Sequence, residues 1–422
     1  MSRTDYPKDG QAMGEIRTPI SLEKLQPYLE KNIDGFAGPV TIKQFGLTGT
    51  VWPVEPDLLP ADAEAVVCAP PRAARQAAVR DGAPRRPRVH DPQGAGRVQR
   101  VPSGGREGPR RSRAQGVCLC MDRDVAGAPF YVMEFLKGRI IADITMPDMP
   151  RKDREECWRS AIRTLALLAT TPLDKLNLPP SFAPDPIAKP YFPRQVKGML
   201  KVSASQSQAP LPDGKGPLGD IVHTAELRPW FEAGAQRVAR ADETHGASIV
   251  HGDYKIDNMV FHPTENRVIG VLDWELCTTG SPLADLSNMT IAFNIRPLSE
   301  EEAANRPPNV MGGLKGVPSE KSGIPDVATL EKWWVHDMNE GYAFLKSQGQ
   351  KERAKWQWPI PHFEWVKSWM AFRLAIILQG IAARAALGQA SSASATPRRD
   401  GMDFYGRCAW DTKQEAEQSA KL

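Results

Sequence analysis

Two short apolar runs that bracket a polar loop, around residues 249–275, constrain this chain more than any other part of its sequence. The runs are Ser248–Val250 and Val268–Leu272, and their length and β-branched content predict two short buried strands. The loop and the position just after the second run carry four polar residues: His251, Asp253, Asn258 and Asp273. The sequence therefore predicts a strand–loop–strand unit with polar residues in the loop and at the end of the second strand.

These residue types, in this order, suit phosphoryl transfer. An Asp can face the acceptor hydroxyl, an Asn five residues later can bind Mg²⁺, and an Asp after the next strand can bind the metal on the phosphate side. A structural interpretation also exists, because His-x-Asp occurs in many loops and an isolated Asp–Asn pair is commonly turn chemistry. We favour phosphoryl transfer because the strand, the loop, the second strand and the final Asp all stand in the required order.

The motif His251-Gly252-Asp253, followed by Asn258 and then by Leu272-Asp273-Trp274-Glu275, resembles the aminoglycoside phosphotransferase/choline kinase superfamily. The longer string HGDYKIDNMVFHPTENRVIGVLDWELCTTGSPLADLSN is similar to one branch, the phosphotransferase domain found alone or fused to acyl-CoA dehydrogenases. The resemblance covers residues 15–46 and 117–410. It implies an α+β, bilobal protein-kinase-like fold, with a small N-terminal sheet lobe and a large, mostly helical C-terminal lobe.

The resemblance also implies an ATP- and Mg²⁺-dependent phosphotransferase that moves the γ-phosphate to a hydroxyl of a small molecule. Asp253 would be the catalytic residue that takes the proton of the hydroxyl, and Asn258 and Asp273 would bind Mg²⁺. The adenine would be held by backbone groups of a strand and the residue after it: Met133, Glu134, Phe135 and Leu136.

Four further residues would support this site, and each has a second interpretation. His251 would shape the loop with its ring bonded to backbone. Lys255 could touch the γ-phosphate, or could be a solvated loop residue. Glu275 could support the metal through water, or could lie on the surface. Asp285 would buttress the catalytic loop, or would be an acidic residue favoured by a helix N-terminus.

Periodicity predicts further elements along the chain. They are helices at 21–33, 151–172, 227–241, 329–350 and 362–388, a strand at 40–45, and a strand–turn–strand over 117–137. Residues 296–330 form a Pro/Gly/Glu-rich loop whose length suggests a lid or a specificity insert. We divide the chain into an N-terminal lobe at 15–137, a catalytic lobe at 138–410 and a tail at 411–422.

The composition limits the classes of partner that we expect for the chain. The chain has 422 residues, of which 41% are hydrophobic and 25% charged, which is typical of a globular protein with a large core. The stretch Trp365–Leu387 is interrupted by charged residues and predicts a buried helix rather than a membrane span. We expect a small-molecule substrate, no nucleic acid and no membrane partner, and the oligomeric state stays open.

Residues 50–116 lie outside the pattern of the rest. They contain no Lys, Phe, Tyr, Ile or Asn, and twelve Arg fall within residues 72–113. No strand or helix period is visible, so the composition predicts disorder or a basic tail. Without interleaved aromatic residues, only non-specific phosphate attraction could draw nucleic acid to the Arg cluster.

A shifted reading frame offers another explanation of this segment. Codons chosen for Pro53–Leu59 and read one nucleotide later give Gln-Ser-Asn-Pro-Thr-Tyr, which resembles an early strand and turn of the family. The same offset converts Arg86–Ala95 into Asp-Arg-Glu-Tyr-Thr-Ile-Leu-Lys-Ala-Leu, which resembles the family helix that carries a Glu. A divergent disordered insert remains the alternative.

The segment matters because the resemblance places a nucleotide-binding Lys and its Glu partner there. No Lys occurs between Gln44 and Arg113, and Arg88 stands where the Glu is expected. The Asp and Asn residues of the motif are intact. Three hypotheses therefore stay open: an active kinase, a catalytically impaired pseudokinase or nucleotide-binding module, and the product of a damaged reading frame.

The sequence says less about the small molecule that would accept the phosphate. Six Trp residues gather near the C-terminus, at positions Trp333, Trp334, Trp356, Trp358, Trp365 and Trp369. They could suit a cation or an acyl chain, although such residues more often form helix core. The link of the similar branch to acyl-CoA metabolism suggests a hydroxyacyl substrate by analogy.

The two ends of the sequence carry signals that concern the cellular location. The first ten residues have no apolar run, so we expect no secretory signal peptide. The last three, Ala420-Lys421-Leu422, resemble a peroxisomal address of the Ser-Lys-Leu type, although a chance match to a tripeptide is not rare. We expect a cytoplasmic or a peroxisomal location.

Overall fold

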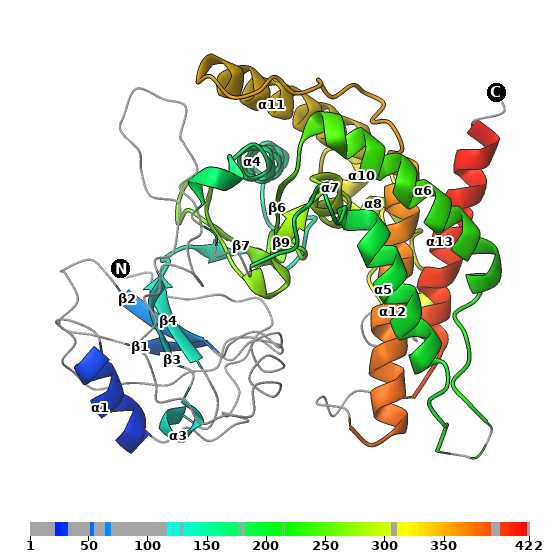
Figure 1. Cartoon of the computed structure of the whole chain (residues 1–422), viewed down its shortest axis with the longest axis horizontal. Helices are drawn as coiled ribbons and strands as arrows, with labels where there is room; N and C mark the ends of the chain where they lie inside the picture. Colours follow the sequence, from blue (N-terminus) through cyan, green and yellow to red (C-terminus); the bar gives the residue numbers. More distant parts are fainter. Residues whose placement is uncertain are drawn as a thin grey trace. The chain divides into compact units, whose positions relative to one another are not determined.

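The chain forms two compact units in a computed structural model (Figure 1). The structure describes residues 22–32, 51–54, 64–68, 116–120, 122–126, 130–176, 178, 182–212, 214, 216–304, 310–389 and 397–419. The first unit contains the described residues up to 146, together with those of 172–182 and 256–277. The second unit contains the described residues of 147–171, 183–255 and 278–422. The lobe boundaries predicted above stay predictions.

A four-stranded antiparallel sheet lies in the first unit. Its order is β1 (Val51–Val54), β2 (Glu64–Cys68), β4 (Phe130–Phe135), β3 (Gly116–Cys120). Strands β3 and β4 confirm the two strands predicted within 117–137, and the short helix α3 (Arg123–Ala126) stands where we predicted only a turn.

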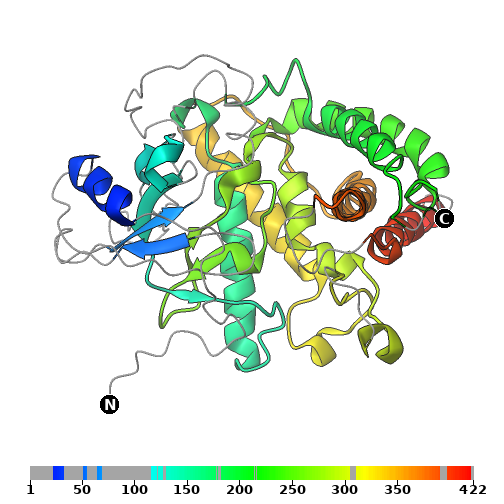
Figure 2. The same ribbon diagram turned by 90° about the horizontal axis from the view of Figure 1, so that it is seen from below.

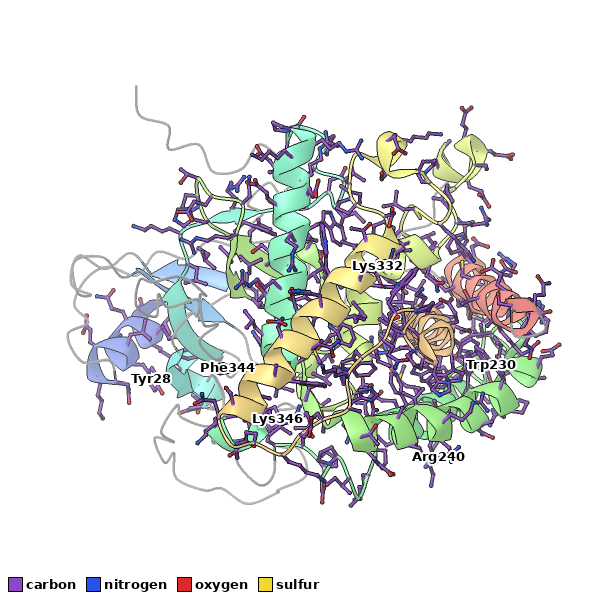
Figure 3. All side chains as sticks on the ribbon, turned by 90° about the horizontal axis from the view of Figure 1, so that it is seen from above. Tyr28, Trp230, Arg240, Lys332, Phe344 and Lys346 are labelled. Carbon is purple, nitrogen blue, oxygen red and sulfur yellow. The ribbon has the colours of Figure 1, made fainter. Side chains whose placement is uncertain are left out.

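The N-terminal helix packs against this sheet. Helix α1 (Leu22–Asn32) confirms the helix predicted at 21–33, and its Leu25 and Leu29 are fully buried. The ring of Tyr28, labelled in Figure 3, meets the ring of Phe130 edge-to-face, with centroids 5.6 Å apart. The strand predicted at 40–45 lies outside the described residues.

Strands β1 and β2 correct our expectation that residues 50–116 have no regular structure. Both are short and rich in Val, and β4 offers β2 a hydrogen-bonding edge from Glu64↔Phe135 to Cys68↔Tyr131. Pairing with an existing strand can order segments too short to show a period of their own. The rest of 50–115 lies outside the described residues.

A second sheet in the first unit has the order β5 (Arg139–Ile140), β7 (Met259–Phe261), β8 (Val268–Val271). The guanidinium of Arg139 donates to the carbonyls of His262 and Glu265 at 2.9 and 2.8 Å and so fixes the β7–β8 turn. Gly138 is required beside it, because a Cβ there would lie 2.3 Å from the carbonyl oxygen of Phe261. The short helix η2 (Leu173–Lys175) completes this unit's described elements outside the site.

The second unit is mostly helical around one antiparallel strand pair, β6 (Ser248–Val250) and β9 (Thr278–Gly280). Strand β6 lies where we predicted it. The helices are α4 (Arg151–Ala169), α5 (Tyr191–Gln206), α6 (Thr224–His245), α7 (Leu283–Met289), α8 (Ile291–Asn294), α9 (Glu300–Ala304), α10 (Ser319–Ser322), α11 (Val327–Ser347), α12 (Phe363–Ala386) and α13 (Asp400–Ser419). The predicted helices at 151–172, 227–241, 329–350 and 362–388 correspond to α4, α6, α11 and α12.

Helix α12 is the core helix of this unit and packs against α5, α6, α7 and α13. Figure 2 shows it end-on in orange, beside α13 in red. By length and composition α12 is the one helix of the described residues that could cross a membrane, but 72% of its apolar window is buried inside the structure, and core helices pass the same test. This burial agrees with the predicted core helix.

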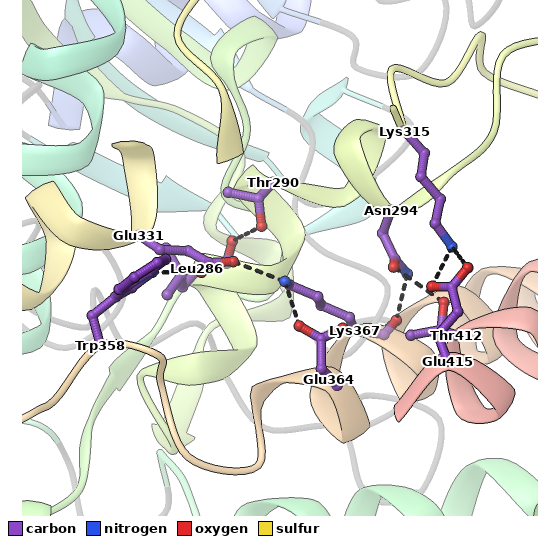
Figure 4. Close-up of polar contacts among 10 residues, drawn as sticks. All are labelled: Leu286, Thr290, Asn294, Lys315, Glu331, Trp358, Glu364, Lys367, Thr412 and Glu415. Carbon is purple, nitrogen blue, oxygen red and sulfur yellow. Dashed lines mark hydrogen bonds and ion pairs between the residues drawn. The ribbon is translucent and has the colours of Figure 1, made fainter. Parts of the chain in front are cut away.

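The tryptophans mostly form core. Trp334, Trp356, Trp365 and Trp369 are at most 4% exposed. The indole of Trp365 donates to the carbonyl of Trp230 on α6. Of the other two, Trp333 is half-buried and Trp358 has 42% of its surface exposed. The indole of Trp358 donates to Glu331 (Figure 4). Glu331 in turn pairs with Lys367 of α12 at 2.8 Å.

Three segments differ from the sequence predictions. Helix α5 was missed in the Pro- and Ser-rich stretch 173–248, because Pro193 in its first turn resembles a break although that position tolerates proline. Helix α13 continues into the segment 411–422 assigned to a tail, where Thr412 is fully buried. The loop predicted at 296–330 contains the short helices α9 and α10.

Candidate active site

The chain leaves β6 in a tight turn that is held by a buried carboxylate. Gly252 has a φ of 88°, in the left-handed region that favours glycine. The carboxylate of Asp285 accepts the backbone N–H of His251 at 2.6 Å and that of Gly252 at 2.8 Å. Asp285 lies in the first turn of α7 and is 2% exposed. The structure therefore places Asp285 where a buttress of the loop would stand.

Burial governs the electrostatics of this carboxylate. It raises the pKa of Asp285 from 3.8 to about 6, against the lowering effect of the two backbone N–H groups and of the charge of Arg373. The guanidinium of Arg373, from α12, also donates to the carbonyl of Gly252 at 3.2 Å. The turn is thus held from two helices through both its N–H groups and its carbonyl.

Asp253 follows the turn with a partly exposed side chain. Its Oδ1 accepts from the side-chain amide of Asn288 at 3.4 Å, and its Oδ2 lies 3.4 Å from the ammonium of Lys255. The N–H of Asp253 donates to Nδ1 of the fully buried His251 at 3.2 Å. This bond requires an unprotonated Nδ1, so the His251 ring serves as a backbone acceptor, in line with the structural role expected for it.

Asn258 and Asp273 come together in the first unit, at one end of the β7–β8 hairpin. Asn258 ends the short helix η3 (Ile256–Asn258) just before β7, and Asp273 comes just after β8. The register pairs Met259 with Val271, and the N–H of Leu272 donates to the carbonyl of Asn258 at 2.8 Å. The hairpin therefore makes neighbours of two residues that are fifteen positions apart in the chain.

Asp273 has an uncommon backbone conformation. Its φ of 64° and ψ of 57° place a non-glycine residue in the left-handed region, directly before the short helix η4 (Trp274–Leu276). Such outliers cost about 1 kcal/mol or more and are concentrated at functional sites. The indole of Trp274 donates to the carbonyl of Val271 at 2.8 Å and helps to hold this turn.

The donor set of the hairpin end fits a hard divalent cation. An amide oxygen and a carboxylate are oxygen ligands of the kind Mg²⁺ prefers, and Mg²⁺ commonly takes one or two protein ligands with phosphate and water completing its shell. In the part of the chain that the structure describes, no three His, Cys, Asp or Glu residues form a metal-binding group. Asn258 and Asp273 would thus hold a cation only together with other oxygen ligands.

The remaining predicted residues are placed as follows. Glu275 is exposed in η4, and Lys255 is 40% exposed beside Asp253. The backbone of Met133–Phe135 belongs to β4, which pairs with β2 along one edge, while the pairing with β3 on the other edge ends at Met133. The side chains of Met133, Glu134 and Phe135 lie outside the description, and Leu136 is half-buried.

Two residues of the site were not predicted from the sequence, Asn288 and Arg373. Asn288 had a sequence signal, because it stands three positions after Asp285 on one helix and so shares its face. The only sequence signal of Arg373 is that it interrupts an apolar helix.

The loop motif, the β7–β8 hairpin and the four-stranded sheet are each features of a kinase-like fold. Residues 108–306 match the model of the phosphotransferase enzyme family. This part of the chain is therefore similar to that family, and the chain has a kinase-like α+β fold, as the sequence predicted.

Two solved structures are similar to the chain in fold. A candidate aminoglycoside phosphotransferase from Ralstonia eutropha JMP134 has a solved structure that is 25% identical, with a TM-score of 0.61 and coverage of 94% of this chain and 99% of that one. Choline kinase from Cryptosporidium parvum Iowa II, 10% identical with a TM-score of 0.52, shares the fold over 95% of this chain and 98% of its own.

Two curated relatives are acyl-CoA dehydrogenase family proteins. Mouse acyl-CoA dehydrogenase family member 10 is 28% identical over 296 residues, which are 69% of this chain and 23% of the relative. Human acyl-CoA dehydrogenase family member 11 is 30% identical over 276 residues, 65% of this chain and 30% of the relative. The chain thus spans less than a third of the length of either protein.

Proposed function

We propose that the chain is an ATP- and Mg²⁺-dependent phosphotransferase that transfers the γ-phosphate to a hydroxyl of a small molecule. The observation that carries the proposal is the turn after β6. There, buried Asp285 binds the N–H groups of His251 and Gly252 and leaves the carboxylate of Asp253 partly exposed. A fixed backbone with an accessible carboxylate is the arrangement required to orient a hydroxyl and accept its proton.

In this mechanism Asp253 accepts a hydrogen bond from the acceptor hydroxyl, orients its oxygen toward the γ-phosphorus, and takes the proton as the new P–O bond forms. Asn258 and Asp273 are the residues that would hold Mg²⁺, which when bound neutralises charge on the phosphates. Backbone groups of Met133–Leu136 would hold the adenine edge. Lys255 of one unit is joined to Ile256 of the other by a peptide bond, so the two sets of residues are closely linked along the chain.

We propose a hydroxyacyl compound as the acceptor class. The support is the set of relatives named as acyl-CoA dehydrogenase family members, of which this chain spans a fraction. Burial of four of the six C-terminal tryptophans counts against an aromatic cage for a cation built from those residues.

The test is phosphotransfer by the purified chain with Mg-ATP and a panel of hydroxyacyl compounds, aminoglycosides and choline, read by mass spectrometry of the phosphorylated acceptor. Asp253→Ala is expected to abolish transfer without changing the unfolding midpoint. Asp257→Asn, an exposed acidic residue of the same loop, is the matched control and is expected to retain activity. Equal activity of wild type and Asp253→Ala would overturn the mechanism.

A second function, a nucleotide-binding module without catalysis, is favoured by one observation. The strands beside β4 are β2 and β3, and neither of their sequences, Glu-Ala-Val-Val-Cys and Gly-Val-Cys-Leu-Cys, offers a Lys for the phosphates. Mg-ATP thermal shifts separate the two functions. A shift that survives Asp253→Ala, without transfer to any acceptor, supports the module, whereas transfer lost in that variant supports the enzyme.

Two further proposals concern the chain itself. A shifted frame in residues 50–116 would restore an early strand and turn and the helix that carries the missing Glu, and sequencing the transcript across codons 46–117 tests it. Ala420-Lys421-Leu422, which lies outside the described residues, is proposed as a peroxisomal address. A fluorescent protein placed ahead of this tripeptide would then collect in peroxisomes, and a diffuse signal would contradict the idea.

A further inference from the structure

We infer that Asn288 is a positioning residue for Asp253: its side-chain amide fixes the carboxylate in the orientation that receives the proton of the hydroxyl. The inference deepens the proposed phosphotransfer function and rests on it. It comes from the Asn288–Asp253 contact in the second unit, which the sequence did not predict.

Helix α7 carries both supports of the loop. Asp285 and Asn288 are three positions apart, so they lie on one face of the helix. Asp285 binds the backbone of His251 and Gly252, while Nδ2 of Asn288 lies 3.4 Å from Oδ1 of Asp253. Every residue of α7 is buried, so this helix is a rigid base for both contacts. One helical turn thus orients the loop backbone and the side chain that the loop presents.

The chemistry fixes which atom of Asn288 faces Asp253. An ionised carboxylate can only accept hydrogen bonds, so the amide must present Nδ2 and not Oδ1. The donor is neutral, so this contact orients the carboxylate without placing a charge beside it.

A second contact of the carboxylate, with Lys255, is less suited to fix it. Lys255 reaches Oδ2 at 3.4 Å with a side chain that is 40% exposed and rotates about four bonds. Asn288 is 7% exposed and has only two side-chain torsions. The buried amide therefore restricts the Asp253 rotamer more than the surface ammonium does.

A matched control exists on the next helix. Asn294 of α8 is also 7% exposed, and its side chain is also hydrogen-bonded, donating to the carbonyl of Lys367 and accepting from Thr412 (Figure 4). Its partners belong to α12 and α13. Removing either amide leaves a similar buried gap, but of the two only Asn288 contacts Asp253.

The experiment compares wild type, Asn288→Ala, Asn288→Asp and Asn294→Ala in two measurements. The first is phosphotransfer. Asn288→Ala is expected to lower kcat by about 10- to 100-fold, as for a misplaced catalytic group, with the KM for ATP unchanged. Asn294→Ala is expected to keep the wild-type kcat. Asn288→Asp preserves the volume but removes the donor, and so tests the idea if Asn288→Ala does not fold.

The second measurement is the crystal structure of each variant, which does not depend on activity. The Asp253 carboxylate is expected to leave its wild-type rotamer in the Asn288 variants and to keep it in Asn294→Ala. An unchanged rotamer in both Asn288 variants would overturn the inference, as would an equal loss of kcat in the Asn288 and Asn294 variants. If wild type itself transfers no phosphate, the proposed function fails, and the crystal structures alone decide the inference.

Discussion

Replacing Asp285 with Asn tests how one buried carboxylate links stability to the candidate catalytic loop. The carboxylate accepts two backbone N–H groups, from His251 and Gly252, one on each oxygen. The amide of Asn has one acceptor oxygen, so one of these N–H groups would face an NH₂ group instead. Leaving a buried donor unpaired costs about 1–3 kcal/mol.

The substitution also has a stabilising effect that depends on pH, because it removes a buried charge. Burial raises the pKa of Asp285 from 3.8 to about 6, so the folded state binds a proton more tightly than the unfolded state. The contribution of this group to stability is therefore fully present below pH 4 and is lost as the pH rises through 6. At pH 8 the buried charge costs about 3 kcal/mol, from a shift of about two pKa units at 1.36 kcal/mol each, and at pH 5 about half of that.

The neutral variant escapes this cost. At pH 8 the relieved charge offsets the unpaired N–H, so wild type and Asp285→Asn are expected to have free energies of unfolding within about 2 kcal/mol of each other. The free energy of unfolding of the variant, minus that of wild type, is expected to be about 1–2 kcal/mol lower at pH 5 than at pH 8. Phosphotransfer is expected to fall about 100-fold at pH 8, because the loop that carries Asp253 loses an anchor.

Urea unfolding at pH 5 and pH 8, followed by tryptophan fluorescence, measures the difference between the two proteins at each pH. Other titrating groups are common to both and largely cancel in that difference. A stability difference that is the same at both pH values would refute the assigned pKa. Full activity of the variant would refute the role of Asp285 in holding the loop.

Further predictions concern the hairpin end and two glycines. Asp273→Asn is expected to abolish phosphotransfer with the unfolding midpoint unchanged, because Asn tolerates the left-handed backbone but lacks the carboxylate charge; a parallel loss of stability in urea would contradict this. Gly138→Ala is expected to destabilise the chain by about 2 kcal/mol or more, because its Cβ would overlap the Phe261 carbonyl oxygen. Gly198→Ala in mid-α5, where a Cβ meets nothing within 4 Å, is expected to stabilise it by up to about 1 kcal/mol, and both glycine variants are read by urea unfolding.

Local pattern predicted much of the site's scaffold. The strands β6 and β8 and the loop motif follow from short-range periodicity. The same holds for α12, whose interrupted apolar run predicted a core helix. Strand β7 was not predicted, because it lies within the segment predicted as a loop, and its pairing with β8 is what brings Asn258 close to Asp273.

Elements that depend on a distant partner were missed or misjudged. Strands β1 and β2 are too short to show a period: β2 pairs with β4, which lies more than sixty residues later in the chain, and β1 pairs with β2. Helix α13 was assigned partly to a tail, because its buried face is defined by contact with α12 and its own sequence is largely polar.

The amino-acid sequence by itself determined the chemical groups available here: a carboxylate, an amide and a second carboxylate in the order that phosphoryl transfer uses. Only the tertiary structure decided what holds them, because Asp285, Asn288 and Arg373 reach the loop from 33 to 121 positions away. A chain's local pattern records which face of an element is buried, but not which distant residue will meet it. That pairing is fixed only when the helices pack.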